Sequence, residues 1–178
     1  AQARSAIEAA IEYTKTRKAF GTPVASFQNT KFELAACSTE VEAAQAMLDQ
    51  AVVEHVTGDL SGPDAARVKL FCTEMQARVI DRCLQLFGGY GYMMEYPIAR
   101  LYTDARVARI YAGTSEVMKV IAVVSALALP GTLITGVFGT NFDNVPGLHS
   151  NWGFALMMTG IFGAAGSMAW FFHRRGWF

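Results

Sequence analysis

The first 110 residues place apolar side chains at every third or fourth position, with polar or charged side chains between them. This spacing predicts amphipathic helices, each of which buries one stripe of side chains. The predicted helices cover residues 1–17, 29–56, 64–87 and 97–106. Short connections join them and no segment alternates with the period of a strand, so we expect an all-α, up-and-down helical bundle.

The two long helices have the most clearly defined expected core positions. In the helix at 29–56, the expected buried stripe comprises Phe32, Ala35, Ala36, Thr39, Ala43, Ala46, Met47 and Val53. In the helix at 64–87, it comprises Val68, Phe71, Cys72, Met75, Val79, Cys83 and Phe87. Pro63 suits the first turn of the latter helix. Gly88 and Gly89 supply its stop signal.

From Val120 onward the chain is almost entirely apolar. A helix predicted from Thr114 runs without a stop signal into Val120–Phe138, and Trp152–Phe172 is a second uncharged segment. Nineteen residues of helix measure about 28 Å, close to a hydrocarbon core. We therefore expect a two-helix transmembrane hairpin after the bundle. Lys and Arg flank only its outer ends, which predicts a membrane location with two spans and both termini cytoplasmic. The alternative is a buried helical hairpin in a soluble protein.

The charged residues divide the chain at the same place. We therefore expect one domain at residues 1–118 and a second at 119–178. Of the 15 Lys and Arg and 15 Asp and Glu, only Lys119, Asp143, Arg174 and Arg175 lie beyond residue 118. The formal net charge is zero and no basic stripe with interleaved aromatic residues occurs, so we expect no nucleic-acid partner. The cysteines have no Cys-x-x-Cys spacing and fit core positions in a reducing compartment better than a metal site. They are Cys37, Cys72 and Cys83.

Six sequence blocks of the bundle occur in the order found in one enzyme family. They are Arg17-Lys18-Ala19-Phe20-Gly21, Phe27-Gln28, the run from Gln85 to Tyr92, Glu95-Tyr96-Pro97, Asp104-Ala105-Arg106 and the run from Ile110 to Glu116. Through these blocks, about residues 1–118 resemble the C-terminal helical domain of the acyl-CoA dehydrogenases. The resemblance implies FAD as cofactor, an acyl-CoA thioester as substrate and oxidation between its α and β carbons.

The resemblance also implies which residues contact the flavin. Those that correspond to contacts with a partner subunit's FAD, and so imply a homo-oligomer, are Arg17, Phe20, Phe27, Gln28, Gln85, Leu86, Phe87, Gly88 and Gly89. Those that correspond to contacts with the subunit's own FAD are Thr114, Ser115 and Glu116, and the substrate-binding positions are Ala112 and Gly113. An arginine fork suits a pyrophosphate, and glycines let backbone N–H groups approach phosphate. Taken alone, the glycine pair is more often a helix stop and Arg17 a solvated surface charge.

One position separates two types within this family. Some members carry the catalytic glutamate at the position of Ala112. In others, which have alanine there, the base lies on the preceding helix, at a position that would fall before Ala1. We therefore expect no catalytic residue in this chain. The N-terminal helical domain and the middle β-domain of the family have no counterpart in the sequence, so acyl-CoA would bind only if other domains complete the site.

The apolar half of the chain carries a second resemblance. The segments involved are Leu129-Pro130, the run from Thr132 to Phe142 and the ending from Arg174 to Phe178. They resemble the membrane hairpin of the CorA family of magnesium channels, over about residues 118–178. That family has Gly-Met-Asn at the pore mouth, and the corresponding ion-pore residues here are Gly139, Thr140 and Asn141. An asparagine oxygen suits hydrated Mg2+ as the transported ion, whereas Thr140 departs from the family's pattern.

These two resemblances give three functional hypotheses. The first is a partial acyl-CoA dehydrogenase that supplies flavin contacts, lacks the catalytic base and is tethered to membrane lipid by the hairpin. The second is a subunit of a CorA-like pore for divalent cations. The third is a non-functional chimera of the two.

Overall fold

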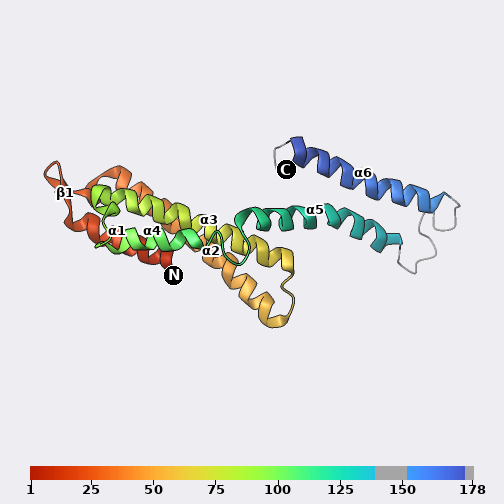
Figure 1. Ribbon diagram of the computed structural model, residues 1–178, viewed down its shortest axis with the longest axis horizontal. Coiled ribbons are helices and arrows are strands. Elements are labelled where there is room, and N and C mark those ends of the chain that lie inside the picture. Colours follow the sequence, from red (N-terminus) through yellow and green to blue (C-terminus); the bar gives the residue numbers. More distant parts are fainter. Residues whose placement is uncertain (139–151, 175–178) are drawn as a thin grey trace. The chain divides into compact units, whose positions relative to one another are not determined.

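The computed structural model describes residues 1–138 and 152–174, without the side chains of some positions in the last two helices. The elements in this part of the chain (Figure 1) are α1 (Gln2–Thr16), β1 (Lys18–Ala19), β2 (Thr22–Pro23), the 3-10 helix η1 (Val24–Ser26), α2 (Gln28–Thr57), α3 (Gly62–Phe87), the 3-10 helix η2 (Gly88–Tyr92), α4 (Pro97–Val107), α5 (Ser115–Phe138) and α6 (Gly153–Arg174). The prediction of a mainly helical protein is confirmed. The chain divides into two compact units, Ala1–Lys119 and Val120–Phe178.

Local signals explain where several helices begin. The Ser61 hydroxyl accepts the backbone N–H of Asp64 at 3.2 Å and so caps α3. Pro97 is the first residue of α4, where its missing N–H would have no helical partner. The hydroxyl of Thr114 accepts the N–H of Val117 at 3.4 Å ahead of α5. The helices of the bundle begin and end within two residues of their predicted bounds.

A small antiparallel hairpin of β1 and β2 was not predicted from the sequence. Lys18 pairs with Pro23 and Ala19 with Thr22. The two turn residues, Phe20 and Gly21, have φ of 53° and 82°, and a tight two-residue hairpin turn of this kind needs positive φ at both central positions. Strands of two residues are too short to produce an alternating pattern, so they could not be predicted from the sequence.

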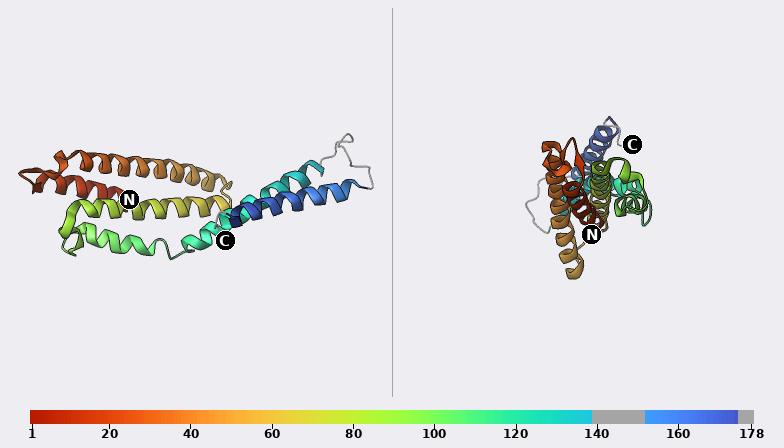
Figure 2. Two further views of the ribbon diagram at one scale, coloured as in Figure 1. Left: turned by 90° about the horizontal axis from the view of Figure 1, so that it is seen from above. Right: turned by 90° about the vertical axis from the view of Figure 1, so that its left-hand side faces the viewer.

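α3 lies at the centre of the first unit, where it packs against α1, α2 and α4 (Figures 1 and 2). Its buried face contains Met75, Val79, Ile80, Cys83 and Phe87. All of these but Ile80 were predicted, whereas the prediction that Phe71 is buried is wrong, since it is 38% exposed. The partners of this face in the core are Ala3, Ala6, Ile7, Ala10, Cys37, Val41, Ala44, Ile98 and Ala105. Many of these partners are alanines, so the helices can approach α3 closely and leave little space between them.

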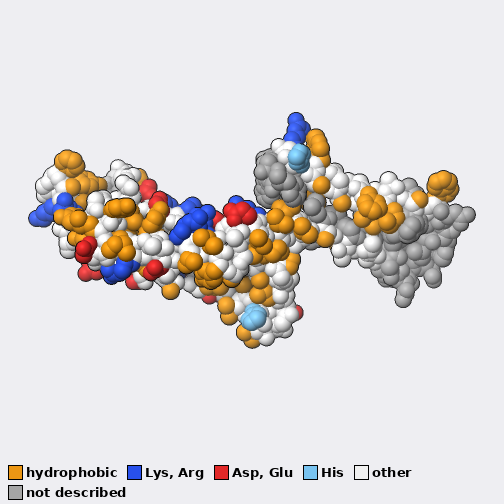
Figure 3. All heavy atoms as spheres, in the orientation of Figure 1, with side chains coloured by type: hydrophobic (Ala, Val, Ile, Leu, Met, Phe, Trp, Pro, Cys, Tyr) orange, Lys and Arg blue, Asp and Glu red, His pale blue; other side chains and the backbone are white. Residues whose placement is uncertain are grey.

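The predicted buried stripe of α2 is wrong. Phe32 and Val53 are 61% and 58% exposed. The residues that α2 buries are Thr30, Cys37, Val41, Ala44 and Ala51. Apolar residues occur all around this helix, so the helical period fits more than one stripe and does not identify the buried one. As a result, hydrophobic side chains lie beside charged ones on the surface of the first unit (Figure 3).

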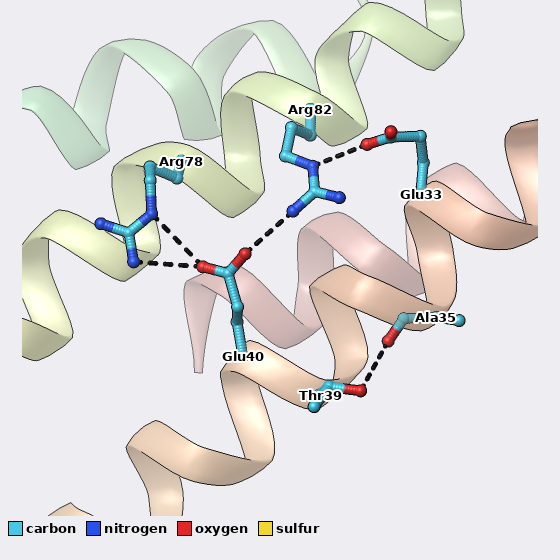
Figure 4. Close-up of polar contacts among 6 residues, drawn as sticks. All are labelled: Glu33, Ala35, Thr39, Glu40, Arg78 and Arg82. Atoms are coloured by element: carbon cyan, nitrogen blue, oxygen red, sulfur yellow. Dashed lines mark hydrogen bonds and ion pairs between the residues drawn. The ribbon is translucent and has the colours of Figure 1, made fainter.

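Charged side chains link α2 to α3 beside the core (Figure 4). Arg82 donates to Glu33 at 2.6 Å and to Glu40 at 2.9 Å, and Arg78 pairs with Glu40 at 3.1 Å. The hydrogen bond to Glu33 raises the pKa of the Arg82 guanidinium. An isolated surface ion pair contributes little, but here two arginines share one carboxylate. This arrangement favours a single register of α2 along α3.

The three cysteines are free thiols, and their predicted core positions are confirmed for two of them. Cys37 and Cys83 are buried, whereas Cys72 is half-buried. The hydrogen bond that the Cys83 thiol donates to Cys37, followed by burial, raises the pKa of Cys83. Cys83 is therefore uncharged at neutral pH and packs as a small apolar side chain.

The second unit contains most of α5 and all of α6. In the described part of the chain, no helix combines the length and the apolar character needed to cross a membrane. The predicted transmembrane hairpin is therefore not found there. Several side chains of the two predicted spans lie outside the described set, as does the connecting segment 139–151. The predicted ion-pore residues Gly139, Thr140 and Asn141 lie in that segment, outside the described residues.

The central position of α3 makes the stability of the first unit sensitive to Ile80. Ile80 is 0% exposed, and we expect Ile80→Ala to lower the free energy of unfolding by about 2–5 kcal/mol, because it removes buried methylene groups and leaves a cavity. Urea denaturation followed by circular dichroism measures the change. Val56→Ala serves as the control, because Val56 is 80% exposed and its truncation should cost less than about 0.5 kcal/mol. Equal effects of the two substitutions would contradict the central role of α3.

Candidate cofactor-binding site

A groove opens where α3 ends and the chain turns into η2. Gly88 ends the helix with φ 58° and ψ −136°, a conformation that a residue with a side chain rarely adopts. Nothing lies within 4 Å of the position that a Cβ atom would take at Gly88 or Gly89. The backbone of these two residues is therefore open to a ligand.

The groove has a volume of about 570 Å3. Its lining residues are Tyr13, Arg17, Val24, Gln85, Leu86, Phe87, Gly88, Gly89, Tyr90 and Met93. Six of the predicted flavin contacts, Arg17 and the run Gln85–Gly89, are thus brought together by the C-terminal ends of α1 and α3. The sequence did not single out the other four lining residues.

Aromatic rings form the base of this groove. Tyr13 stacks on Phe87 with the ring centroids 4.1 Å apart, and its hydroxyl donates to the carbonyl oxygen of Phe87 at 3.3 Å. Tyr96 packs against Phe87 at 6.0 Å and against Tyr90 at 5.3 Å. Burial raises the pKa of the Tyr13 hydroxyl, which is neutral at physiological pH. The groove therefore offers flat apolar surfaces beside an open backbone.

Arg17 provides the positive charge of the groove. Its backbone N–H donates to the carbonyl oxygen of Tyr13, and its own carbonyl oxygen accepts from the N–H of Val24, both at 2.8 Å. The guanidinium lies 5.4 Å from the ring centroid of Tyr90. Within residues 1–138 and 152–174, no carboxylate forms an ion pair with Arg17. A bound anion could therefore use the full charge of this guanidinium.

The remaining predicted contacts with a partner's flavin lie outside the groove lining. Phe20, in the turn of the β1–β2 hairpin, is 98% exposed, and its ring packs edge-on against Phe27 at 6.4 Å. Gln28, the first residue of α2, is also exposed. Val24, the first residue of η1, lies between these residues in the sequence and lines the groove. The exposed Phe20 ring is therefore close to the groove in the sequence and is available to another molecule.

Thr114, Ser115 and Glu116 lie at a separate place, the start of α5. They line a small cavity of about 70 Å3 together with Arg106, Arg109 and Ile110. The hydroxyl of the buried Ser115 donates to Glu74 at 2.8 Å, and the Arg109 guanidinium also donates to that carboxylate, at 3.0 Å. The Glu74 carboxylate is thus already paired with Arg109, whereas Thr114 is half-buried and Glu116 is exposed.

Neighbouring groups keep the Glu74 carboxyl group ionised. Burial by itself would raise the pKa of this carboxyl, but the Ser115 hydrogen bond and the Arg109 charge outweigh it and hold the pKa below its usual range. The pKa of Glu116 is also lowered, first by its own backbone N–H and then by the Thr114 hydroxyl. Both carboxylates are therefore ionised at neutral pH.

The predicted substrate-binding positions form the turn just before α5. Ala112 and Gly113 both have positive φ, at 53° and 95°. The Lys69 ammonium group, on α3, donates to the carbonyl oxygens of Tyr111, at 3.0 Å, and of Gly113. Lys69 thereby holds the turn in this conformation. No general base occupies position 112, since alanine has no ionisable group.

Several residues that shape the groove or the start of α5 were not predicted from the sequence. Tyr13 stands four positions before Arg17, a spacing that puts both on one helix face and could have indicated a shared site. Tyr90 lies in a run of aromatic residues whose partner could not be inferred. Lys69 and Glu74 gave no signal beyond that of polar residues on a helix surface. Among the described residues, no cluster of three or more His, Cys, Asp or Glu is arranged to hold a metal ion.

These features define a helical domain in which an arginine lies beside an open glycine backbone. Residues 1–126 match the family model described as "Acyl-CoA dehydrogenase, C-terminal domain", and the chain belongs to this family. A second model, "CorA-like Mg2+ transporter protein", matches residues 98–174, less than half of the chain.

Individual relatives agree with this assignment. The long-chain specific acyl-CoA dehydrogenase of Mus musculus mitochondria is 45% identical over 107 residues, 60% of this chain and 25% of that protein. The 3-(aryl)acrylate reductase of Clostridium sporogenes is 39% identical over 119 residues, 67% of this chain and 32% of that protein. The chain thus spans about a third or less of the length of these relatives.

Solved structures show the same fold. The acyl-CoA dehydrogenase from Geobacillus kaustophilus superposes with a TM-score of 0.68 and 40% identity, over 70% of this chain and 33% of that one. The butyryl-CoA dehydrogenase from Megasphaera elsdenii also gives 0.68, with 37% identity over 71% of this chain and 33% of that one. The likeness is confined to about a third of each of these structures.

The Glu74 cluster makes a pH-dependent contribution to stability. Because the folded-state pKa of Glu74 is lowered, its stabilisation is present above the unfolded-state pKa and is lost as the pH falls through the folded-state pKa. We expect Glu74→Gln to lower the free energy of unfolding by about 1–2 kcal/mol near pH 7, and the difference to shrink below about pH 4. Urea titrations across this range measure it. Glu95→Gln, at an exposed position, is the control, and parallel pH profiles for all three proteins would contradict the prediction.

Proposed function

We propose that residues 1–119 are a flavin-binding C-terminal domain of an FAD-dependent acyl-CoA dehydrogenase. The observation that carries the proposal is the groove in which the Arg17 guanidinium, unpaired among the described residues, lies beside the open backbone of Gly88 and Gly89. A pyrophosphate fits these groups, because it accepts bidentate hydrogen bonds from a guanidinium and further bonds from backbone N–H groups. The family assignment of residues 1–126 supports the same ligand.

In this proposal the chain's own residues bind and orient the cofactor. Arg17 neutralises the charge of a phosphate group, and the glycines allow that group to approach the backbone. Thr114 offers a hydroxyl and the start of a helix to a second anionic group. FAD, when bound, supplies the acceptor for the substrate's hydride. The general base, absent from position 112, would have to come from a part of the enzyme other than the residues described here.

The separation of the two groups of contacts supports an oligomer. The groove lies at one end of α4 and the Thr114–Glu116 cavity at the other, and each has its own lining residues. One domain would therefore contact two flavins, its own and that of a partner subunit. Phe20, exposed in its hairpin, is available to the partner. An acyl-CoA substrate belongs to the completed assembly, because the described residues form no enclosed acyl site with a base.

Flavin binding tests the proposal directly. We expect the full chain to quench FAD fluorescence on titration, and Arg17→Met to weaken binding by about 10- to 100-fold, the loss expected for charge-assisted hydrogen bonds. Lys18→Met is the matched control, because Lys18 is the adjacent cation, is exposed and does not line the groove. A chain that does not bind FAD, or that binds it equally well without Arg17, would refute the proposal.

A second proposal concerns residues 120–178. The uncharged segments of the sequence and the match to a CorA-like model over residues 98–174 support association of this unit with a membrane, although no described helix is suited to span one. We expect the full chain to stay in the membrane pellet after carbonate washing and a chain ending at Lys119 to be released. Recovery of the full chain in the wash without detergent would refute the association. If flavin and membrane binding are both absent, the chain is the non-functional chimera.

A further inference from the structure

The position of the Arg17 side chain depends on a contact that the family assignment does not explain. The Arg17 backbone is fixed on both sides by hydrogen bonds at 2.8 Å, but its side chain has several rotatable bonds beyond that point. A surface arginine samples many rotamers, and holding one of them costs conformational entropy. Among the described residues no carboxylate restrains the guanidinium, so another group must do so if it is to meet a phosphate in a fixed place.

Tyr90 is that group in this structure. Its ring centroid lies 5.4 Å from the central carbon of the Arg17 guanidinium, within the range in which a cation is attracted to an aromatic face. Gly88 and Gly89 turn the chain after α3, and this turn brings Tyr90 back beside the end of α1. Both residues line the same groove.

The Tyr90 ring is itself held by other aromatic rings. The ring centroid of Tyr96 lies 5.3 Å from that of Tyr90, and the ring centroid of Tyr13 lies 6.4 Å from it in an edge-to-face arrangement. Tyr13 is anchored in turn by its stack on Phe87 and by its hydrogen bond to the Phe87 carbonyl oxygen. The support of the guanidinium therefore extends through these rings into the core, where Phe87 is buried.

We propose that Tyr90 is a positioning residue, which holds the Arg17 guanidinium over the groove so that a phosphate group meets a cation already in place. This inference rests on the proposed flavin-binding function and adds the means by which the site is preorganised. The contact uses the face of the ring and not the hydroxyl. Phenylalanine at position 90 should therefore preserve the contact with Arg17, whereas leucine should not.

Titration of FAD into the full chain and its variants tests the inference. We expect Tyr90→Leu to weaken binding by about 3- to 10-fold and Tyr90→Phe to leave it within about twofold, since the ring is retained. Tyr92→Leu is the matched control, because Tyr92 is two residues away and 91% exposed. In an Arg17→Met background, Tyr90→Leu should have no further effect, since the group that it positions is gone.

A second measurement does not depend on the flavin. The Nε–H proton of Arg17 should show an upfield ring-current shift in nuclear magnetic resonance spectra of the unchanged chain and of Tyr90→Phe, and lose it in Tyr90→Leu. An unshifted proton would overturn the inference. So would equal losses of affinity from Tyr90→Leu with and without Arg17, because Tyr90 would then act on the ligand or on the fold. Absence of FAD binding by the unchanged chain would refute the proposed function, while the proton shift would still report whether Tyr90 holds Arg17.

Discussion

The packing of α3 is the constraint on which the rest of the first unit depends. Its buried face, with Val79 and Ile80 fully enclosed, requires α1, α2 and α4 to cover it on different sides. Burial of each large aliphatic side chain contributes about 1.5–3 kcal/mol, far more than any of the surface ion pairs. One group of predicted cofactor contacts is built where α1 and α3 end, and the other where Arg109 and Ser115 reach Glu74, near the middle of α3.

The two groups of contacts depend on different parts of α3 and on different interactions. At the C-terminal end, Phe87 is buried and the next two residues are glycines, so the chain leaves the core directly into an open groove. Toward the N-terminal half, Lys69 and Glu74 reach the turn and the first residues of α5 through hydrogen bonds. The first place is apolar with an available cation, and the second is polar, with Glu74 paired to Arg109.

Much of the fold, but less of the site, could be predicted from the sequence. Helix bounds were predictable because Pro97, Ser61 and the glycines after Phe87 act locally. The buried stripe of α2 could not be predicted, because the apolar residues of that helix occur on all its sides. Only the neighbouring helices determine which face is covered. The resemblance identified Arg17 and Gly88–Gly89 but not Tyr13 or Tyr90. Their roles arise from contacts between the ends of different helices, which no local pattern records. The segment with Gly139–Asn141 lies outside the described residues, so its predicted role stays a prediction.

The boundary between the two units falls inside one helix and within the residues that both family models match. α5 runs unbroken from Ser115 to Phe138, while the compact units meet at Lys119 and Val120. The models share residues 98–126, which include α4 and the first half of α5. An α-helix satisfies its backbone hydrogen bonds within itself, so it can continue while the character of its side chains changes. Met118 and Val123 are still buried, whereas no charged residue follows Lys119 until Asp143. Continuity of the helix is therefore no evidence that the two units share a function, and each must be tested separately.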